Sequence, residues 1–330
     1  MIAIAPHISA WLQRRLPVER GASKHTCDAY ATTFQLLFTF AAGRLNVAPS
    51  GLVFEQLDAI LLLDFLDHLQ SDRNNSPRTR NSRLAAIKSF MRFMEHREPA
   101  ALDQIRRVLA IPSQAVDVRP VPYLTPTEAQ AVLDAPDPST RSGARDRALL
   151  HIGVTGGLRV SELVGLRMDD LTFRDRYLDL SIRGKGRKER VLTLWKVVGD
   201  SVRAWLAVRG DTVVPELFVN ARGQALTRAG AEYILRKHVA TGLKTCPSLA
   251  AKRVSPHVLR HTTAMNTLRA TRDIRKVSLW LGHASTQSTE IYLTQDPTER
   301  LETLEAVIPP SLRPGTFNPP DKLLDLLRKR

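Results

Sequence analysis

Four short segments of the 330-residue chain carry side chains that could act together on a phosphate group. They are residues 155–163, 184–190, 257–261, and 281–283 followed nine residues later by Tyr292. Each segment alone is a weak signal, because an arginine at a helix start or a Gly-Lys-Gly turn is common on protein surfaces. Together they supply two arginines, a lysine, two histidines and a tyrosine, and this set is suited to phosphoryl transfer.

The two arginines can stabilise the charge that spreads over phosphate oxygens. We assign Arg159 and Arg260 to this clamp, because each guanidinium is permanently charged and its planar fork matches phosphate geometry. Tyrosine has an ordinary pKa of ~10 and is mostly protonated near neutrality. Nearby cations must therefore favour the phenolate of a tyrosine that attacks phosphorus.

In their order and spacing, the four segments strongly resemble the tyrosine recombinase (phage integrase) family, including its Xer-type members. The resemblance is good over about residues 122–300, whereas residues 1–105 resemble the helical core-binding domain by pattern alone. It implies a 3′-phosphotyrosyl link to DNA and religation without ATP. The catalytic set that it implies is Arg159, Lys185, His257, Arg260, His283 and Tyr292.

The resemblance also implies roles for these side chains. Lys185 would protonate the leaving 5′-oxygen, His257 would take the proton of the tyrosine, and His283 would hydrogen-bond the phosphate. Glu162, three residues after Arg159, either orients that arginine or is a helix-surface acid. The bend at residues 269–273 lacks the glycine often found there in the family.

Two groups of cations are candidates for contact with a phosphate backbone. Residues 73–97 hold seven cations against the single acid Glu95, which favours a DNA-facing helix over an ordinary solvated face. Around the Gly-Lys-Gly turn, further cations are predicted to contact the backbone rather than to catalyse. The predicted contacts are Arg78, Arg80, Arg83, Lys88 and Arg92 in the first group and Arg183, Arg187, Lys188 and Arg190 in the second.

Composition limits the class of protein. The formal charge is 48 − 33 = +15 and the pI is about 10.4, which predicts a polyanionic partner, nucleic acid or an acidic membrane face. No apolar stretch approaches the ~20 residues of a spanning helix. The sequence thus predicts a soluble, cytoplasmic, nucleoid-associated protein without membrane contact. The chain has two cysteines, Cys27 and Cys246, which lie far apart in sequence and form no CxxC motif, and this excludes a disulfide scaffold and a zinc ribbon.

No metal or other cofactor is expected. The one tempting zinc site is the pair His257 and His261, four residues apart. It lacks the glutamate of His-Glu-x-x-His, and Arg260 beside it would repel a dication. His261 is better explained as a packing residue.

The patterning predicts a mainly α fold with a small antiparallel β-sheet: a helical N-terminal domain followed by an α+β catalytic domain. Helices are expected after Ser23, over 57–69, after Ser76, after Thr125 and over 143–154, with strands at 177–182 and 190–194. The predicted domains are 1–107 (core-binding), a linker at 108–121, 122–310 (catalytic), and a tail at 311–330 that carries a short amphipathic helix.

The resemblance implies double-stranded DNA as the partner. It also implies a homo-oligomer in a tetrameric synapse on DNA, or assembly with related recombinases. The tail helix is expected to pack on another protomer, with docking on its own protomer as the competing hypothesis. A non-catalytic basic DNA-binding protein and a type IB topoisomerase-like enzyme remain as alternatives to a recombinase that integrates, excises or transposes DNA.

Overall fold

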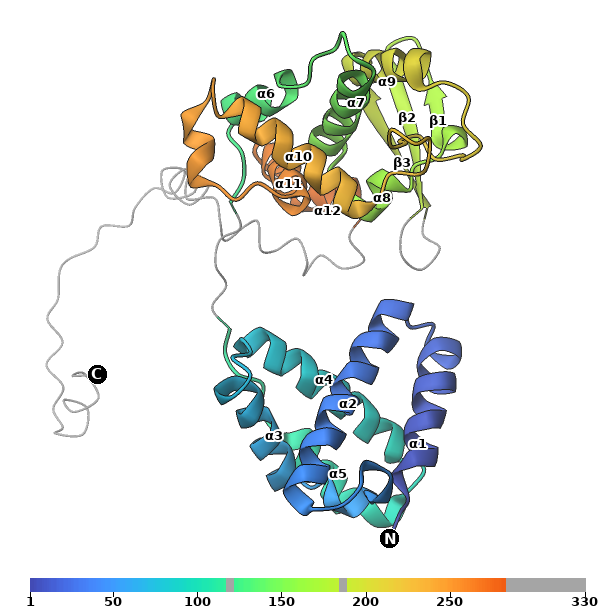
Figure 1. The fold of residues 1–330 in the computed structure, drawn as a ribbon, viewed down its shortest axis with the longest axis vertical. Coiled ribbons are helices and arrows are strands. Elements are labelled where there is room, and N and C mark those ends of the chain that lie inside the picture. Colours follow the sequence, from blue (N-terminus) through green and yellow to red (C-terminus); the bar gives the residue numbers. More distant parts are fainter. Residues whose placement is uncertain (117–121, 184–188, 283–330) are drawn as a thin grey trace, which may run out of the picture. The chain divides into compact units, whose positions relative to one another are not determined.

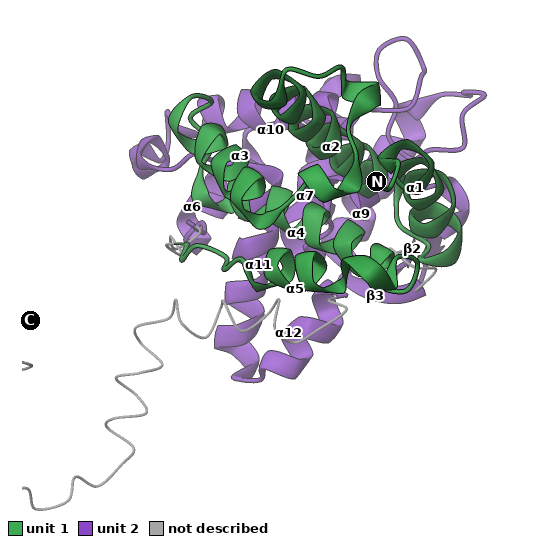
Figure 2. Cartoon of the chain, turned by 90° about the horizontal axis from the view of Figure 1, so that it is seen from below, with its two compact units in different colours: residues 1–119 green, residues 120–330 purple. Residues whose placement is uncertain are grey.

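The computed structural model describes residues 1–116, 122–183 and 189–282. The chain divides into two compact units, Met1–Arg119 and Pro120–Arg330, which Figure 2 colours separately. Each unit buries its own set of apolar side chains. Among the described residues, no helix is both long and apolar enough to cross a membrane.

The first unit is helical throughout (Figure 1). Ser23 and Ser76 cap its two long helices by accepting hydrogen bonds from the backbone N–H groups of Thr26 and Thr79, which confirms both predicted helix starts. The elements are α1 (Ile4–Ala10), the π-helical η1 (Trp11–Glu19), α2 (Lys24–Leu45), η2 (Pro49–Gly51), η3 (Phe54–Gln56), α3 (Ala59–Ser71), α4 (Pro77–Met94), η4 (Pro99–Ala101) and α5 (Leu102–Ala110).

An aromatic cluster forms the centre of this unit. Trp11 packs edge-on against Phe34 and Phe90, with ring centroids 5.2 and 5.4 Å away. The core extends further along the chain than the sequence predicted. Val108 lies in α5 and Ile111 directly follows it, and both side chains are buried in the first unit. Both residues fall in the stretch 108–121 that the sequence assigned to a linker, and their apolar side chains belong to the packed core.

The second unit combines helices with one small sheet. Thr125 and Glu128 form the expected capping box at the start of α6: each side chain accepts a hydrogen bond from the other residue's backbone N–H. The elements are α6 (Pro126–Asp134), α7 (Arg141–Gly156), α8 (Val160–Val164), η5 (Met168–Asp170), β1 (Leu171–Phe173), β2 (Tyr177–Arg183), β3 (Glu189–Trp195), α9 (Lys196–Arg209), α10 (Arg228–Gly242), η6 (Pro247–Ala251), α11 (Pro256–Thr271) and α12 (Ile274–Leu281).

The sheet is antiparallel with strand order β1-β2-β3, which confirms the predicted fold class. In β2 and β3, alternate residues such as Leu180 and Leu192 are buried, and these two pair across the strands. Helices α7 and α9 pack against the sheet. Strand β1 has only three residues, too few for an alternating pattern to be visible in the sequence.

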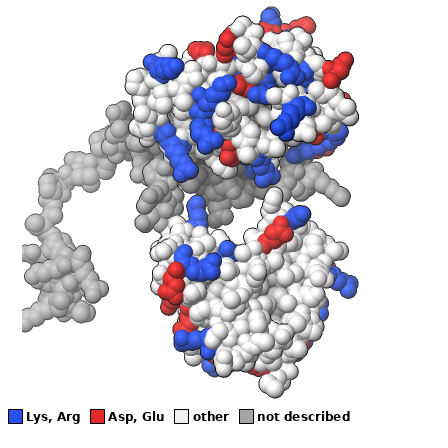
Figure 3. All heavy atoms as spheres, in the orientation of Figure 1, with Lys and Arg blue, Asp and Glu red and all other residues white. Residues whose placement is uncertain are grey.

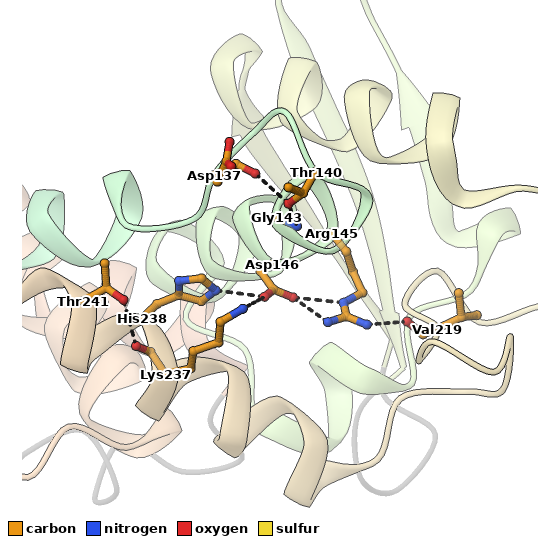
Figure 4. Close-up of polar contacts among 9 residues, drawn as sticks. All are labelled: Asp137, Thr140, Gly143, Arg145, Asp146, Val219, Lys237, His238 and Thr241. Carbon is orange, nitrogen blue, oxygen red and sulfur yellow. Dashed lines mark hydrogen bonds and ion pairs between the residues drawn. The ribbon is translucent and has the colours of Figure 1, made fainter.

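A buried carboxylate joins α7 to α10 (Figure 4). Asp146 lies 2.7 Å from Nη2 of Arg145 and 2.8 Å from Nε2 of His238, while Arg145 also donates to the carbonyl of Val219. Burial by itself would raise the pKa of Asp146. The hydrogen bonds from His238 and Arg145 outweigh burial and hold this pKa below its usual value. This network fixes α10 and the loop before it on α7.

Candidate active site

Arg159 occupies the N-cap position of α8, three residues after α7 ends at Gly156. Its backbone N–H donates to Oε2 of Glu162 at 2.9 Å, and its Nη1 donates to Oε1 at 2.7 Å. The side chain is nevertheless 41% exposed. One carboxylate thus fixes the direction of this guanidinium while a large part of it stays accessible to an anion.

Arg260 is buried in α11 and bridges two other elements. Its Nη1 donates to the carbonyl of Gly157 at 2.6 Å, and its Nη2 donates to the carbonyl of Leu281 at 2.8 Å. Gly157 is two residues before Arg159, and Leu281 is the last residue of α12. The two predicted clamp arginines, 101 residues apart in sequence (260 − 159), are thereby tied to one short turn.

Gly157 permits this close packing. Its φ of 60° lies in the left-handed region, and a Cβ there would come within 2.8 Å of Leu281 and 3.1 Å of Thr263. Gly157 is also the C-cap of α7, which confirms the helix predicted over 143–154 and extends it to Arg141–Gly156. The bend between α11 and α12, where the sequence has no glycine, is made by Arg272 at φ 52°.

Glu162 is a buried acid rather than a surface one. Its side chain is 6% exposed and lies between two arginines, with Oε2 3.0 Å from Nη2 of Arg190. Burial alone would raise the pKa of Glu162. Hydrogen bonds from Arg190 and from the N–H of Arg159 act against burial and hold this pKa below its usual value. The interpretation of Glu162 as an orienting residue for Arg159 fits this geometry.

Arg190 is an inward-facing member of this network. Its side chain is only 15% exposed, it pairs with Glu162, and its guanidinium lies so close to Gly282 that a Cβ there would be 2.5 Å from Nη1. Sequence reasoning assigned Arg190 to the DNA backbone and missed this position. The signal was present, because Arg190 alternates in step with Leu192 and Leu194, which face the core.

The two histidines of α11 differ in surroundings. His257 lies in the first turn, one turn before Arg260, and is exposed. His261 is buried, with its ring 6.4 Å from that of Tyr123, as expected of a packing residue. Within the described part of the chain, no group of three His, Cys, Asp or Glu side chains could hold a metal ion.

Several predicted site residues lie outside the described residues. They are Lys185, Arg187, Lys188, His283, Tyr292 and the whole tail at 311–330. The described chain does fix where two of these segments begin. Arg183 pairs with Glu189 at the end of the β2–β3 ladder, so residues 184–188 connect these two strands, and His283 directly follows Gly282 at the end of α12.

The cations of α4 do not share one role. Lys88 donates to the carbonyl of Ile111, Arg80 to that of Pro112, and Arg83 to Ala29 and Thr33. Burial, with a smaller contribution from the charge of Arg92, lowers the pKa of Lys88. Among the predicted phosphate contacts on α4, only Arg78 and Arg92 are exposed.

The described surface carries both signs of charge. On the face of the second unit shown in Figure 3, Lys and Arg side chains are interspersed with acidic ones. Arg183 is 61% exposed and lies 3.4 Å from Asp170.

Near the site, a largely apolar cavity of about 690 Å³ is lined by the end of α7, strand β3 and helices α11 and α12. Its lining includes Thr155, Val191, Leu279 and Trp280.

Two family models match this chain, one in each of its two units. The Phage integrase family matches residues 122–299, and the Phage integrase N-terminal SAM-like domain matches residues 8–98. A protein of Sinorhizobium fredii named as an integrase/recombinase, y4rC, is 43% identical over 98% of both chains. Tyrosine recombinase XerC of Pelotomaculum thermopropionicum is 33% identical over 87% of this chain and 92% of its own.

Solved structures share the fold. XerH site-specific recombinase bound to difH substrate has a TM-score of 0.64 at 24% identity, covering 91% of this chain and 84% of the other. The Tn1549 transposon integrase in complex with circular intermediate DNA has a TM-score of 0.67 at 15% identity, covering 92% and 99%. The motifs around Arg159 and Arg260, the two matched domains and the relatives agree, and the chain belongs to the phage integrase family of tyrosine recombinases.

Proposed function

We propose that this protein is a site-specific recombinase that cuts double-stranded DNA and rejoins it through a 3′-phosphotyrosyl intermediate. The observation that carries the proposal is the junction of Arg260 with the carbonyls of Gly157 and Leu281. This junction ties α11, which carries Arg260, to the turn that precedes Arg159 and to Leu281, two residues before His283. Family membership supports the same reaction, and XerH, of the same fold, is named as a recombinase bound to its DNA substrate.

In the proposed reaction, the phenolic oxygen of Tyr292 attacks the scissile phosphorus. The bond from phosphorus to the 5′-oxygen breaks as the bond to the tyrosine forms, so the bond energy is kept for religation. Arg159 and Arg260 stabilise the non-bridging oxygens, Lys185 gives the 5′-oxygen its proton, His257 takes the proton of Tyr292, and His283 hydrogen-bonds the phosphate. Glu162 keeps Arg159 in place. No step uses a metal or another cofactor.

The first unit and the linker would close the protein on DNA, with Arg78, Arg92 and Arg183 as exposed candidates for phosphate contact. We place the domain boundaries at 1–111 for the core-binding domain and 122–310 for the catalytic domain, because Ile111 still belongs to the first core. The protein would act at the nucleoid, as a tetrameric synapse of its own copies or together with related recombinases.

A covalent trap tests the proposal. Nicked duplexes tiled across the DNA that borders the gene should give a protein–DNA adduct that survives denaturation. Tyr292→Phe should bind the same duplex without forming the adduct, while the matched control Tyr177→Phe, at an exposed tyrosine of β2, should form it normally. An adduct that persists in Tyr292→Phe would show a different nucleophile.

The same assay separates the alternatives. DNA binding without an adduct in the natural protein would favour a non-catalytic DNA-binding protein. Adduct formation and relaxation of supercoiled DNA without any need for two sites would favour a type IB topoisomerase-like enzyme. A recombinase should yield joined products only when two sites are present.

A further inference from the structure

The segment that leads into the catalytic unit is bonded to the helix that carries Arg260. Tyr123 and Leu124 directly precede α6. The backbone N–H of Leu124, which is fully buried, donates to Oγ1 of Thr262 in α11 at 2.9 Å. Two turns further along the same helix, Nη2 of Arg269 donates to the phenolic oxygen of Tyr123 at 2.6 Å. Tyr123 and Leu124, called the lead-in below, therefore hold α11 at two separate points.

The ring of Tyr123 adds packing to these hydrogen bonds. The guanidinium of Arg269 lies 4.9 Å from the ring centroid, which is cation–π geometry. Tyr123 also packs against the small core between α11 and α12, which contains Met265 and Leu281. Leu281 is the residue whose carbonyl receives Nη2 of Arg260. A shift of Tyr123 would thus reach both the helix of Arg260 and Leu281, a described acceptor of Arg260.

A buried ion pair anchors the lead-in from the other side. Nζ of Lys252 donates to the backbone carbonyl of Tyr123 at 2.8 Å and to Glu128, whose side chain is 3% exposed. Burial would raise the pKa of Glu128, but the hydrogen bonds from Lys252, the N–H of Thr125 and Ser248 hold it below its usual value. The carboxyl of Glu128 is consequently ionised near neutral pH, and its pair with Lys252 fixes the backbone from which the Tyr123 side chain extends.

We propose that Tyr123 and Arg269 form a brace that positions Arg260, so that the rate of DNA cleavage depends on how residues 122–125 are held against α11. The inference rests on the proposed function. Its physical basis is the tight geometry around Arg260, which donates to two described carbonyls in elements other than α11. Misplacement of a catalytic group by ~1 Å can reduce a rate ~100-fold, so a small slide of α11 is enough.

Tyr123→Phe is the informative variant, because it keeps the ring and removes only the hydroxyl that Arg269 binds. On a nicked duplex at saturating protein, we expect the first-order rate of adduct formation to fall ~10-fold. The Kd for the duplex and the Tm should stay close to those of the natural protein. Tyr177→Phe is the matched control and should change none of the three quantities.

Two further measurements separate positioning from simple loss of stability. Arg269→Gln should slow cleavage similarly, and the double variant should be no slower than the slower single one, because both changes break the same hydrogen bond. Hydrogen exchange should rise in α11 of Tyr123→Phe and stay unchanged in α9. An unchanged cleavage rate in Tyr123→Phe, or a loss of rate matched by losses of Tm and DNA affinity, would overturn the inference. A natural protein that forms no adduct would contradict the proposed function instead.

Discussion

Helix α4 of the first unit and the arginine cluster of the second unit are both rich in cations, but they use them differently. In α4, Arg80, Arg83 and Lys88 satisfy carbonyl or hydroxyl oxygens of their own unit. In the second unit, a buried acid and two carbonyls orient Arg159 and Arg260, and Arg159 stays 41% exposed. Positive charge in the sequence predicts an anionic partner. Which cations are able to contact that partner depends on the hydrogen bonds and ion pairs that each one makes within the protein.

The largest expected effect tests the second unit. Arg260→Gln removes a guanidinium that holds two carbonyls, and we expect adduct formation to slow by ~100- to 1,000-fold. The free energy of unfolding should also fall by about 1–3 kcal/mol, because buried carbonyls lose their donors. Arg92→Gln, at an exposed arginine of α4, is the control and should leave cleavage at saturating protein unchanged. Equal slowing of cleavage by both variants would contradict the different roles assigned to Arg260 and to the exposed arginine of α4.

A second prediction concerns the acid between two arginines. Glu162→Gln leaves Arg190 without its charged partner and should lower the free energy of unfolding at pH 7 by about 3 kcal/mol. The pKa of Glu162 is held below its ordinary value of 4.5, so its contribution to stability is fully present above about pH 4.5 and is lost as the pH falls through the lowered pKa.

Urea unfolding at pH 7 and pH 3 checks this sign. The natural protein should lose more stability between the two pH values than Glu162→Gln does. If both proteins lose the same amount, Glu162 is not the ionised partner of Arg190 and Arg159.

Sequence patterns predicted the parts of the fold and of the site that depend on the spacing of nearby residues. The caps at Ser23, Ser76 and Thr125 were predictable, because each needs only a side chain and a backbone N–H three residues away. Strands β2 and β3 were predictable from alternation. The motifs brought Arg159 and Arg260 into one hypothesis, and the structure joins both to one turn through Gly157.

Contacts between distant segments were not predictable in the same way. Lys88 is bonded to a carbonyl 23 residues away and Arg83 to one 54 residues away, so counting cations on α4 overestimated its free positive face. Helical periodicity does identify one of these inward-facing cations. Arg80 lies four residues before the buried Leu84, on the apolar stripe of the helix, and thus faces inward. The Tyr123–Arg269 contact spans 146 residues and had no local signal.

The smallest expected effect sharpens the comparison within α4 itself. Arg92→Gln should reduce the slope of log K against log salt for DNA binding by ~1, because an exposed arginine that meets a phosphate releases a counterion. Lys88→Gln should leave this slope unchanged and lower the Tm, since its ammonium holds the carbonyl of Ile111. The reverse pattern would make Lys88 the DNA contact and Arg92 a solvated surface charge.

Two of the described glycines with positive φ, Gly157 and Gly282, have a consequence for any effort to redirect this enzyme to new DNA sequences. Both sit where an added methyl group would collide with a neighbour, at Leu281 for Gly157 and at the guanidinium of Arg190 for Gly282. Libraries of variants should leave these two positions fixed and vary exposed side chains instead. Substitutions at either glycine should mostly give inactive variants, whichever DNA target is used for selection.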